Sequence, residues 1–187
     1  MKVTFLGSKR LVLQCDVISK EVIADELRDA SLSFEDLHLT VFHIGKSREL
    51  YAEVAAISGV SLDAYEARMV TYLRQCTQRS RLTYQGEIIS ADLLESDGHT
   101  FSVLRIAPEA TLLELRDWCR HSFLHLLKRN GIPDPEHFMQ SSSVVQQHSP
   151  AWLPHVTLAA KSTDRTLGAA LVRRQLVFGP LHVRRSG

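Results

Sequence analysis

The alternation of hydrophobic and polar residues along the chain predicts a mixture of strands and helices. Short apolar stretches that alternate with polar residues indicate strands, whereas apolar residues at steps of three and four indicate helices. The strands are expected over residues 2–6, 11–15, 37–44, 81–90, 99–107, 153–160 and 176–185. The helices are expected after Ser19, a suitable N-cap, and over residues 61–77, about 108–129 and near 164–175.

The stretch 61–77 gives the clearest helical signal. Its apolar residues build a single stripe, which consists of Leu62, Tyr65, Met69, Tyr72, Leu73 and Cys76. The helix near 108–129 has a similar stripe, and Gly131 is expected to end it. On its opposite side His121 and His125 have the i, i+4 spacing of metal-binding histidines, but charged neighbours favour a solvated face for both.

Residues 130–151 are rich in Pro, Ser and Gln, which predicts a loop. A loop of that length inside a compact domain is often a lid or a binding loop. His137, His148 and Trp152 could touch a substrate there, although packing is the favoured role for Trp152.

A three-residue pattern occurs once in each half of the chain. It is His38-Leu39-Thr40 in LHLTVFHIG and His155-Val156-Thr157 in LPHVTLAAK. Because side chains alternate between the two faces of a strand, each histidine shares a face with its threonine, about 7 Å away along the strand. The residue between them points to the opposite, buried side.

The residue types in this pattern suit the cleavage of a phosphodiester. Imidazole titrates near pH 6.5, so one histidine can act as a base and the other as an acid near neutral pH. Each such proton transfer contributes about 10²–10⁴-fold to a rate. A threonine hydroxyl can donate a hydrogen bond to a phosphate oxygen. Two facing copies would therefore hold one phosphate without needing a metal.

The pieces LHLTVF and PHVTLA resemble the two signature motifs of the two-histidine (2H) phosphoesterase superfamily, which includes the bacterial RNA 2′,3′-cyclic phosphodiesterases, also called 2′-5′ RNA ligases. The resemblance implies a bilobal α+β fold, in which two pseudo-symmetric antiparallel sheets line a central cleft and the helices lie outside. It also implies that His38 and His155 are catalytic and that Thr40 and Thr157 bind the phosphate. In hydrolysis we expect His155 to activate water and His38 to protonate the leaving 2′ oxygen.

One position departs from the ligase-type members, many of which carry an arginine five residues after the second histidine. Ala160 occupies this position, followed by Lys161. Six residues of strand span about 20 Å, so Lys161 would lie too far from His155 to share its phosphate.

Two neighbours of the first motif have alternative interpretations. Phe42 would share the face of His38 and could stack on a base, although a core position is favoured. Strand alternation places His43 on the opposite face from His38, which argues against a shared metal site.

Composition limits the remaining possibilities. With 187 residues, of which 44% are hydrophobic, the chain suits a single domain over 1–187, which we take as a monomer. Its net charge of +1 gives no overall positive potential that would require a nucleic-acid partner. Four arginines near the C-terminus form either a local basic patch or, as we favour, a solvated tail. Cys15, Cys76 and Cys119 fit reduced thiols, and neither a signal peptide nor a membrane span is recognisable, so we expect a cytoplasmic protein.

The sequence thus predicts an enzyme that hydrolyses a 2′,3′-cyclic phosphate or a 2′-5′ linkage in a nucleotide or at an RNA end, with no cofactor, metal or membrane partner. A module that binds nucleotide or RNA without turnover is the first alternative. The second is an unrelated α/β protein in which the two motifs coincide by chance.

Overall fold

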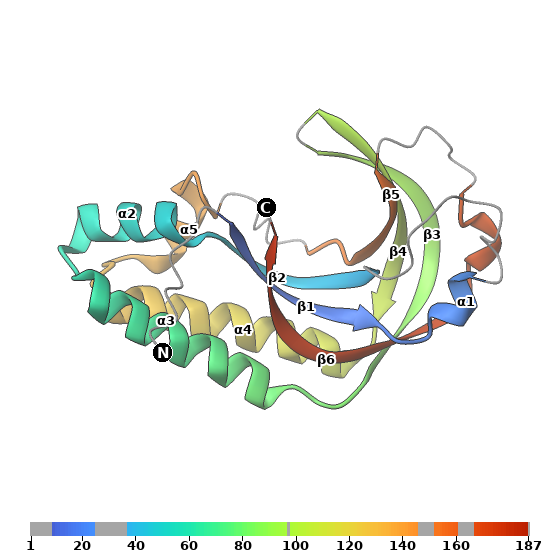
Figure 1. Ribbon diagram of the computed structural model, residues 1–187, viewed down its shortest axis with the longest axis horizontal. Coiled ribbons are helices and arrows are strands. Elements are labelled where there is room, and N and C mark those ends of the chain that lie inside the picture. Colours follow the sequence, from blue (N-terminus) through green and yellow to red (C-terminus); the bar gives the residue numbers. More distant parts are fainter. Residues whose placement is uncertain (1–8, 25–36, 97, 146–151, 161–166, 187) are drawn as a thin grey trace.

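Antiparallel strands form the centre of the molecule (Figure 1). The computed structural model describes residues 9–24, 37–96, 98–145, 152–160 and 167–186. Within these residues the strands are β1 (Arg10–Val17), β2 (His38–Lys46), β3 (Tyr84–Ser96), β4 (His99–Pro108), β5 (His155–Ala160) and β6 (Gln175–Ser186). The strand predicted over 2–6 and residues His148 and Lys161 lie outside the described residues.

The strands follow the order β1-β2-β5-β4-β3-β6, and the sheet closes where β6 returns to β1. Two three-stranded halves make up this ring, β6-β1-β2 and β3-β4-β5. Four backbone pairs join the halves between β3 and β6, whereas β2 and β5 share the single pair Leu39–Val156 among the described residues. The two halves therefore meet most sparsely beside the two histidine motifs.

The α+β class expected from the sequence is confirmed. In place of two separate sheets, however, the structure has one sheet, because backbone hydrogen bonds join the halves at both edges. The bilobal character, and a single domain over 1–187, stay predictions.

The helices of the described residues are α1 (Lys20–Ala24), α2 (Ser47–Ser58), α3 (Leu62–Arg79), α4 (Ala110–Arg129), α5 (Pro135–Ser141) and the 3-10 turn η1 (Ala169–Leu171). The backbone N–H of Ala64 donates to Ser61 Oγ at 3.4 Å, which caps α3. The Oγ of Ser19 instead accepts from the backbone N–H of Val177 at 2.8 Å and so ties the start of α1 to β6. Helix α2 was not predicted from the sequence.

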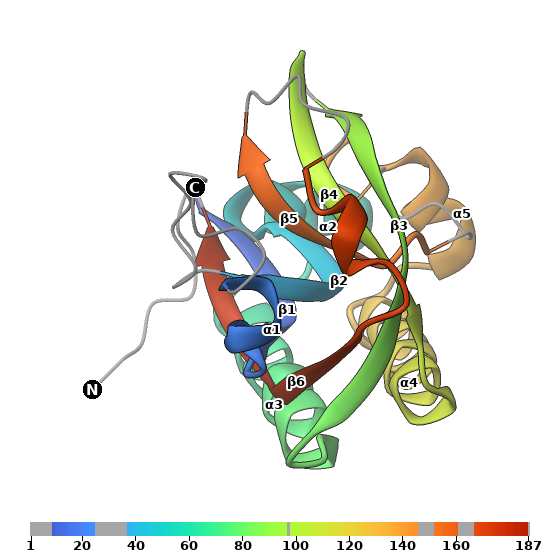
Figure 2. The same ribbon diagram turned by 90° about the vertical axis from the view of Figure 1, so that its right-hand side faces the viewer.

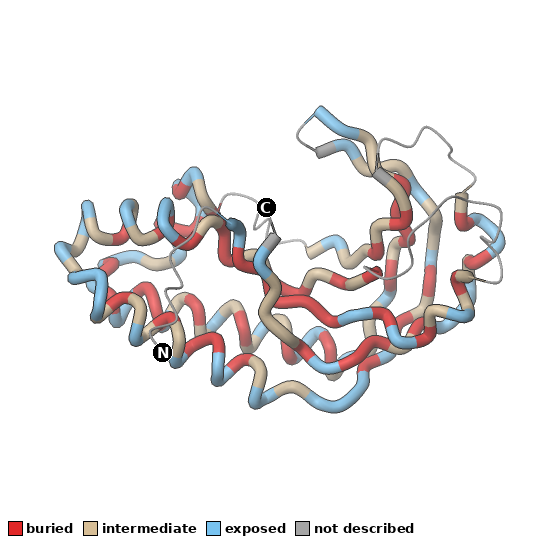
Figure 3. The backbone as a smooth tube through the Cα atoms, viewed as in Figure 1, coloured by how far each residue is buried: buried red, intermediate tan, exposed pale blue. Residues whose placement is uncertain are grey.

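Helices α3 and α4 pack against the outside of the curved sheet (Figure 2). The ring of Phe123 on α4 contacts those of Phe42 and Tyr72, with centroids 5.4 Å and 5.6 Å apart. The hydroxyl of Tyr72 donates to the carbonyl of Cys119 at 3.2 Å, which fixes α3 against α4. Buried positions follow the strands and the helix sides that meet them (Figure 3).

Part of the predicted loop over 130–151 is helical. Asp134 accepts a hydrogen bond from the backbone N–H of His137 and caps α5, and Pro135 occupies its first turn, a favoured place for proline. After α5, Ser142 and Ser143 hydrogen-bond to Glu53 on α2. These contacts hold the chain against α2. Residues 130–145 of the predicted loop are therefore packed against the rest of the protein.

Two further sequence expectations can be compared with the structure. All three cysteines are buried and free, in agreement with reduced thiols. Within the described ranges, none of the helices combines the length and the hydropathy needed to span a bilayer.

Candidate active site

One face of the sheet turns away from α4 and carries most of the polar side chains of the strands. We call it the inner face. Its strand positions comprise Gln14, Asp16, His38, Thr40, His43, Ser90, Asp92, Arg105, His155, Thr157, His182 and Arg184. The opposite, outer face carries Leu39, Phe42 and Val156, of which Phe42 contacts α4. The two histidine motifs thus lie on the face that the helices leave uncovered.

The pairing of Leu39 with Val156 brings the two motifs together. Because the strands are antiparallel, one step to either side of this pair places His38 across from Thr157 and Thr40 across from His155. Side chains directly opposite each other in such a pair lie about 4.5–5.5 Å apart, and diagonal neighbours about 7–8 Å apart. Each histidine therefore has two threonine hydroxyls nearby, one on its own strand and one on the other.

Both histidines are half-buried. The positive charge of His38 is one of the influences that lower the pKa of His155, in agreement with their diagonal positions across the strand pair. Two imidazoles from opposite halves of the chain therefore share one site.

A bulge in β2 overturns two of the positions expected from the sequence. Gln14 pairs with Thr40 and the preceding residue, Leu13, pairs with Phe42, so β2 has one more residue than β1 between these pairs. An extra residue reverses the alternation of side chains beyond it. Phe42 consequently turns outward into the core, where it is 3% exposed, and His43 turns to the inner face.

The prediction that Phe42 could stack on a substrate base is therefore corrected, because its ring packs on Phe123. His43 is in turn a site residue that alternation assigned to the wrong face. Burial, followed by the positive charges of Arg10, His155 and His38, lowers the pKa of His43 to about 4. His43 is thus a neutral imidazole at physiological pH, beside the two motifs.

A carboxylate faces the first motif. Asp16 on β1 pairs with His38, and its Oδ1 lies 2.9 Å from Nε2 of His182 and accepts a hydrogen bond from Nε2 of Gln14 at 3.0 Å. Partial burial raises the pKa of Asp16, but hydrogen bonds from His182 and Gln14 and the positive charges of His182 and His38 lower it further than burial raises it. Asp16 is therefore a carboxylate at neutral pH, and it lies opposite His38 in the strand pair.

A guanidinium faces the second motif. Arg105 on β4 pairs with His155. Burial is the main cause that lowers the pKa of His155; a hydrogen bond to the carbonyl of Leu153 opposes it, and the charges of Arg105 and His38 add to the lowering. The surroundings of His155 therefore favour the neutral imidazole.

The tautomer of this neutral ring follows from one contact. Nδ1 of His155 lies 2.9 Å from the carbonyl oxygen of Leu153. A carbonyl oxygen only accepts, so Nδ1 carries the hydrogen and Nε2 presents its lone pair. His155 is in the form that a general base requires.

Trp152 connects the two strands that carry the motifs. Its Nε1–H donates to the backbone carbonyl of Thr40 at 3.2 Å, and the guanidinium of Arg116 on α4 lies 5.4 Å from its ring centroid. The sequence favoured a packing role for Trp152. In the structure Trp152 directly precedes β5 and contacts β2, so it links these two strands where few backbone bonds join them.

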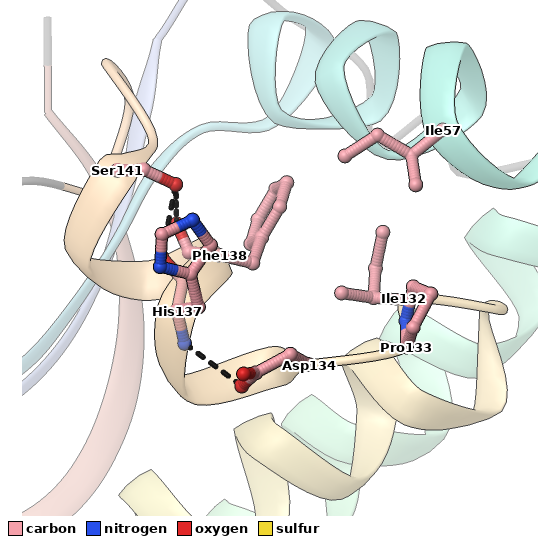
Figure 4. A pocket seen from close by; sticks show the side chains of 7 residues that line it. All are labelled: Ile57, Ile132, Pro133, Asp134, His137, Phe138 and Ser141. Atoms are coloured by element: carbon pink, nitrogen blue, oxygen red, sulfur yellow. Dashed lines mark hydrogen bonds between the residues drawn. The ribbon is translucent and has the colours of Figure 1, made fainter.

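Other sequence candidates lie elsewhere. His121 and His125 are exposed on α4, as their charged neighbours indicated, and among the described residues no group of three potential ligands could hold a metal ion. His137 lines a separate cavity of about 350 Å³ between α2 and α5, together with Ile57, Ile132, Pro133, Asp134, Phe138 and Ser141 (Figure 4). The lining of this cavity is mostly apolar.

The sequence interpretation missed Asp16, Arg105 and His182 as site residues. A signal existed in each case, because each is a charged or titratable residue within an apolar strand. Strand pairing, however, was required to show that Asp16 lies beside His38 and Arg105 beside His155.

Comparisons with known proteins support the fold. No protein-family model matches this chain, and no curated protein does. The structure is similar to the crystal structure of TT0787 of Thermus thermophilus, with a TM-score of 0.50 and 12% identity, covering 93% of this chain and 83% of that chain. This likeness shows a shared fold alone.

Two other solved structures are less similar by TM-score. A phosphoesterase has a TM-score of 0.49 and 14% identity over 96% of this chain and 89% of its own. E. coli LigT in apo form has a TM-score of 0.42 and 16% identity over 83% of this chain and 74% of its own. The case for a function therefore depends on the site.

Proposed function

We propose that this protein is a phosphodiesterase of the two-histidine phosphoesterase type, which hydrolyses a 2′,3′-cyclic phosphate or a 2′-5′ linkage in a nucleotide or at an RNA end. The observation that carries the proposal is the pairing of Leu39 with Val156, which directs both His-x-Thr motifs to one face. A single phosphate between them would lie within reach of two imidazoles and two hydroxyls.

The charges around the two histidines support different roles for them. His155, with Arg105 opposite and Nδ1–H held by Leu153, is the base. His38, with the Asp16 carboxylate opposite, is the acid. The two motifs are alike in sequence, so their different neighbours in β1 and β4 are what distinguish them.

The reaction then follows in one displacement. Nε2 of His155 takes a proton from water while the water oxygen bonds to phosphorus. The bond from phosphorus to the ribose oxygen breaks, and that oxygen takes the proton carried by His38. The hydroxyls of Thr40 and Thr157 donate to the non-bridging oxygens, where charge increases in the transition state. Proton exchange with solvent restores both histidines.

The test uses the purified full-length protein in the presence of a chelator. Adenosine 2′,3′-cyclic phosphate and 2′-5′-linked diadenosine are offered, and product formation is followed by chromatography. His38→Ala and His155→Ala should each lower kcat/KM by about 10²–10⁴-fold, the usual contribution of one acid or base. The double variant should lose far less than the product of the two effects, because the residues act as a unit.

His121→Ala is the matched control, since it removes an exposed histidine from α4 and should leave the rate unchanged. Full activity in both His38→Ala and His155→Ala would show the mechanism to be wrong. Tight binding of either compound without any product would indicate a binding module instead.

A further inference from the structure

Arg105 occupies a defined place on the inner face. It lies on β4, pairs with His155 on β5, and its side chain is 20% exposed. Its Nε lies 3.5 Å from Oδ2 of Asp92 on β3, and the same Oδ2 accepts a hydrogen bond from Ser90 at 2.8 Å. Asp92, itself held by Ser90, therefore lies beside Nε of the guanidinium.

One nitrogen of this guanidinium is unsatisfied. Nη1 of Arg105 is buried and has no hydrogen-bond partner among the residues that the structure describes. Leaving a buried donor unpaired costs about 1–3 kcal/mol, and more for a charged group, so such atoms are uncommon in native proteins. An unpaired, charged donor beside a half-buried histidine indicates a ligand with an anionic oxygen.

We propose that Arg105 is a catalytic residue whose guanidinium donates to a non-bridging oxygen of the reacting phosphate, beside the hydroxyls of Thr40 and Thr157. This inference rests on the proposed function. Guanidinium suits the task because it is always charged and presents several donors in a fixed plane. An oxygen at Nη1 would lie on the His155 side of the phosphate, where water attacks.

The same side chain also acts on the base. The charged and titratable groups that face His155 are Arg105 on β4 and His38 and His43 on β2. Removal of the Arg105 charge should raise the pKa of His155. As pH falls, the neutral form of His155 that acts as the base should therefore disappear at a higher pH than in the wild type. A purely structural ion pair with Asp92 would not give tighter phosphate binding.

The experiment compares Arg105→Ala and Arg105→Lys with Arg120→Ala. Arg120 on α4 is a matched control because its side chain is 27% exposed and pairs with the half-exposed Glu136, much as Arg105 pairs with Asp92. Arg105→Ala should lower kcat/KM by about 10²–10³-fold, the usual effect of removing one transition-state donor. Arg105→Lys keeps the charge but not the planar fork, and should fall between Arg105→Ala and the wild type.

Two readouts need no turnover. Affinity for adenosine 2′- and 3′-monophosphate, measured by calorimetry, should fall about tenfold or more in Arg105→Ala. The pKa of His155, followed by NMR of its ring Cε1–H, should rise in the same variant. Melting temperatures of all three variants separate these effects from loss of folding.

The outcomes separate the two proposals. If His38→Ala and His155→Ala abolish turnover while Arg105→Ala matches Arg120→Ala in rate and monophosphate affinity, the role of Arg105 is refuted and the proposed function stands. If the wild type forms no product from any phosphodiester, the proposed function fails. Unchanged monophosphate affinity in Arg105→Ala would then also refute Arg105 as a phosphate ligand.

Discussion

Leu39 on β2 is paired with Val156 on β5, and both residues are completely buried. The pair joins two strands from opposite halves of the chain and sets their register. Each of its members is the middle residue of a His-x-Thr motif, so the same contact that completes the outer core directs all four polar side chains to the inner face.

In a plot of kcat/KM against pH, the decrease on the acid side should lie at a lower pH than that of an ordinary histidine. His155 must be neutral to act as a base, and its pKa is lowered chiefly by burial. As pH falls, kcat/KM should therefore remain high below 6.5 and decrease only as His155 becomes protonated. A profile measured from pH 4 to 9 checks this; an acid limb above 6.5 would contradict the assignment of the base.

His43 should make the stability of the protein depend on pH. Its pKa is about 4 in the folded protein, against 6.5 in the unfolded chain. As pH falls below 6.5, the unfolded state binds a proton that the folded state does not, so the free energy of unfolding should decrease, by up to about 3 kcal/mol near pH 4. Urea unfolding of wild type and His43→Asn at pH 7 and pH 4.5 measures the difference. An equal loss of stability in the two proteins would refute it.

Trp152→Phe should lower kcat/KM although it costs the fold little stability. Loss of the hydrogen bond from Nε1 to the Thr40 carbonyl costs about 0.5–1.5 kcal/mol. It also loosens β2 beside β5, so kcat/KM should fall severalfold. Trp118→Phe is the control, since Arg79 lies over that ring in the same way, at 5.3 Å, on another side of α4. Comparable losses of activity in both variants would argue against a specific role for Trp152.

Gly45→Ala should destabilise the fold through a clash at the end of β2. Gly45 has a φ of +96°, and an added Cβ would come within 2.8 Å of the Val144 carbonyl oxygen. Strain and overpacking together should cost about 2–4 kcal/mol. Gly59→Ala shares a positive φ of +68° but meets nothing within 4 Å, so it should cost only about 1–2 kcal/mol. Denaturant unfolding of both variants measures the difference.

Local signals in the sequence were sufficient for most of the elements. The apolar stripe of 61–77 predicted α3, and Ser61 caps it. The repeated His-x-Thr predicted two strands with a shared chemistry, and both motifs lie in strands whose intervening residues are buried. These features depend on residues within a few positions of one another, where propensity and alternation act directly.

Phe42 and His43 show where such reasoning ends. Alternation assigned each to the wrong face, because a bulge depends on how β2 fits β1 and leaves no mark in β2 itself. The places of Asp16 and Arg105 in the site also required the structure, since the residues that they face, His38 and His155, come from other strands. The sequence by itself determined that two His-x-Thr motifs lie in two apolar strands. Only the tertiary structure decided which charge faces which histidine, because strand pairing joins residues that are far apart along the chain.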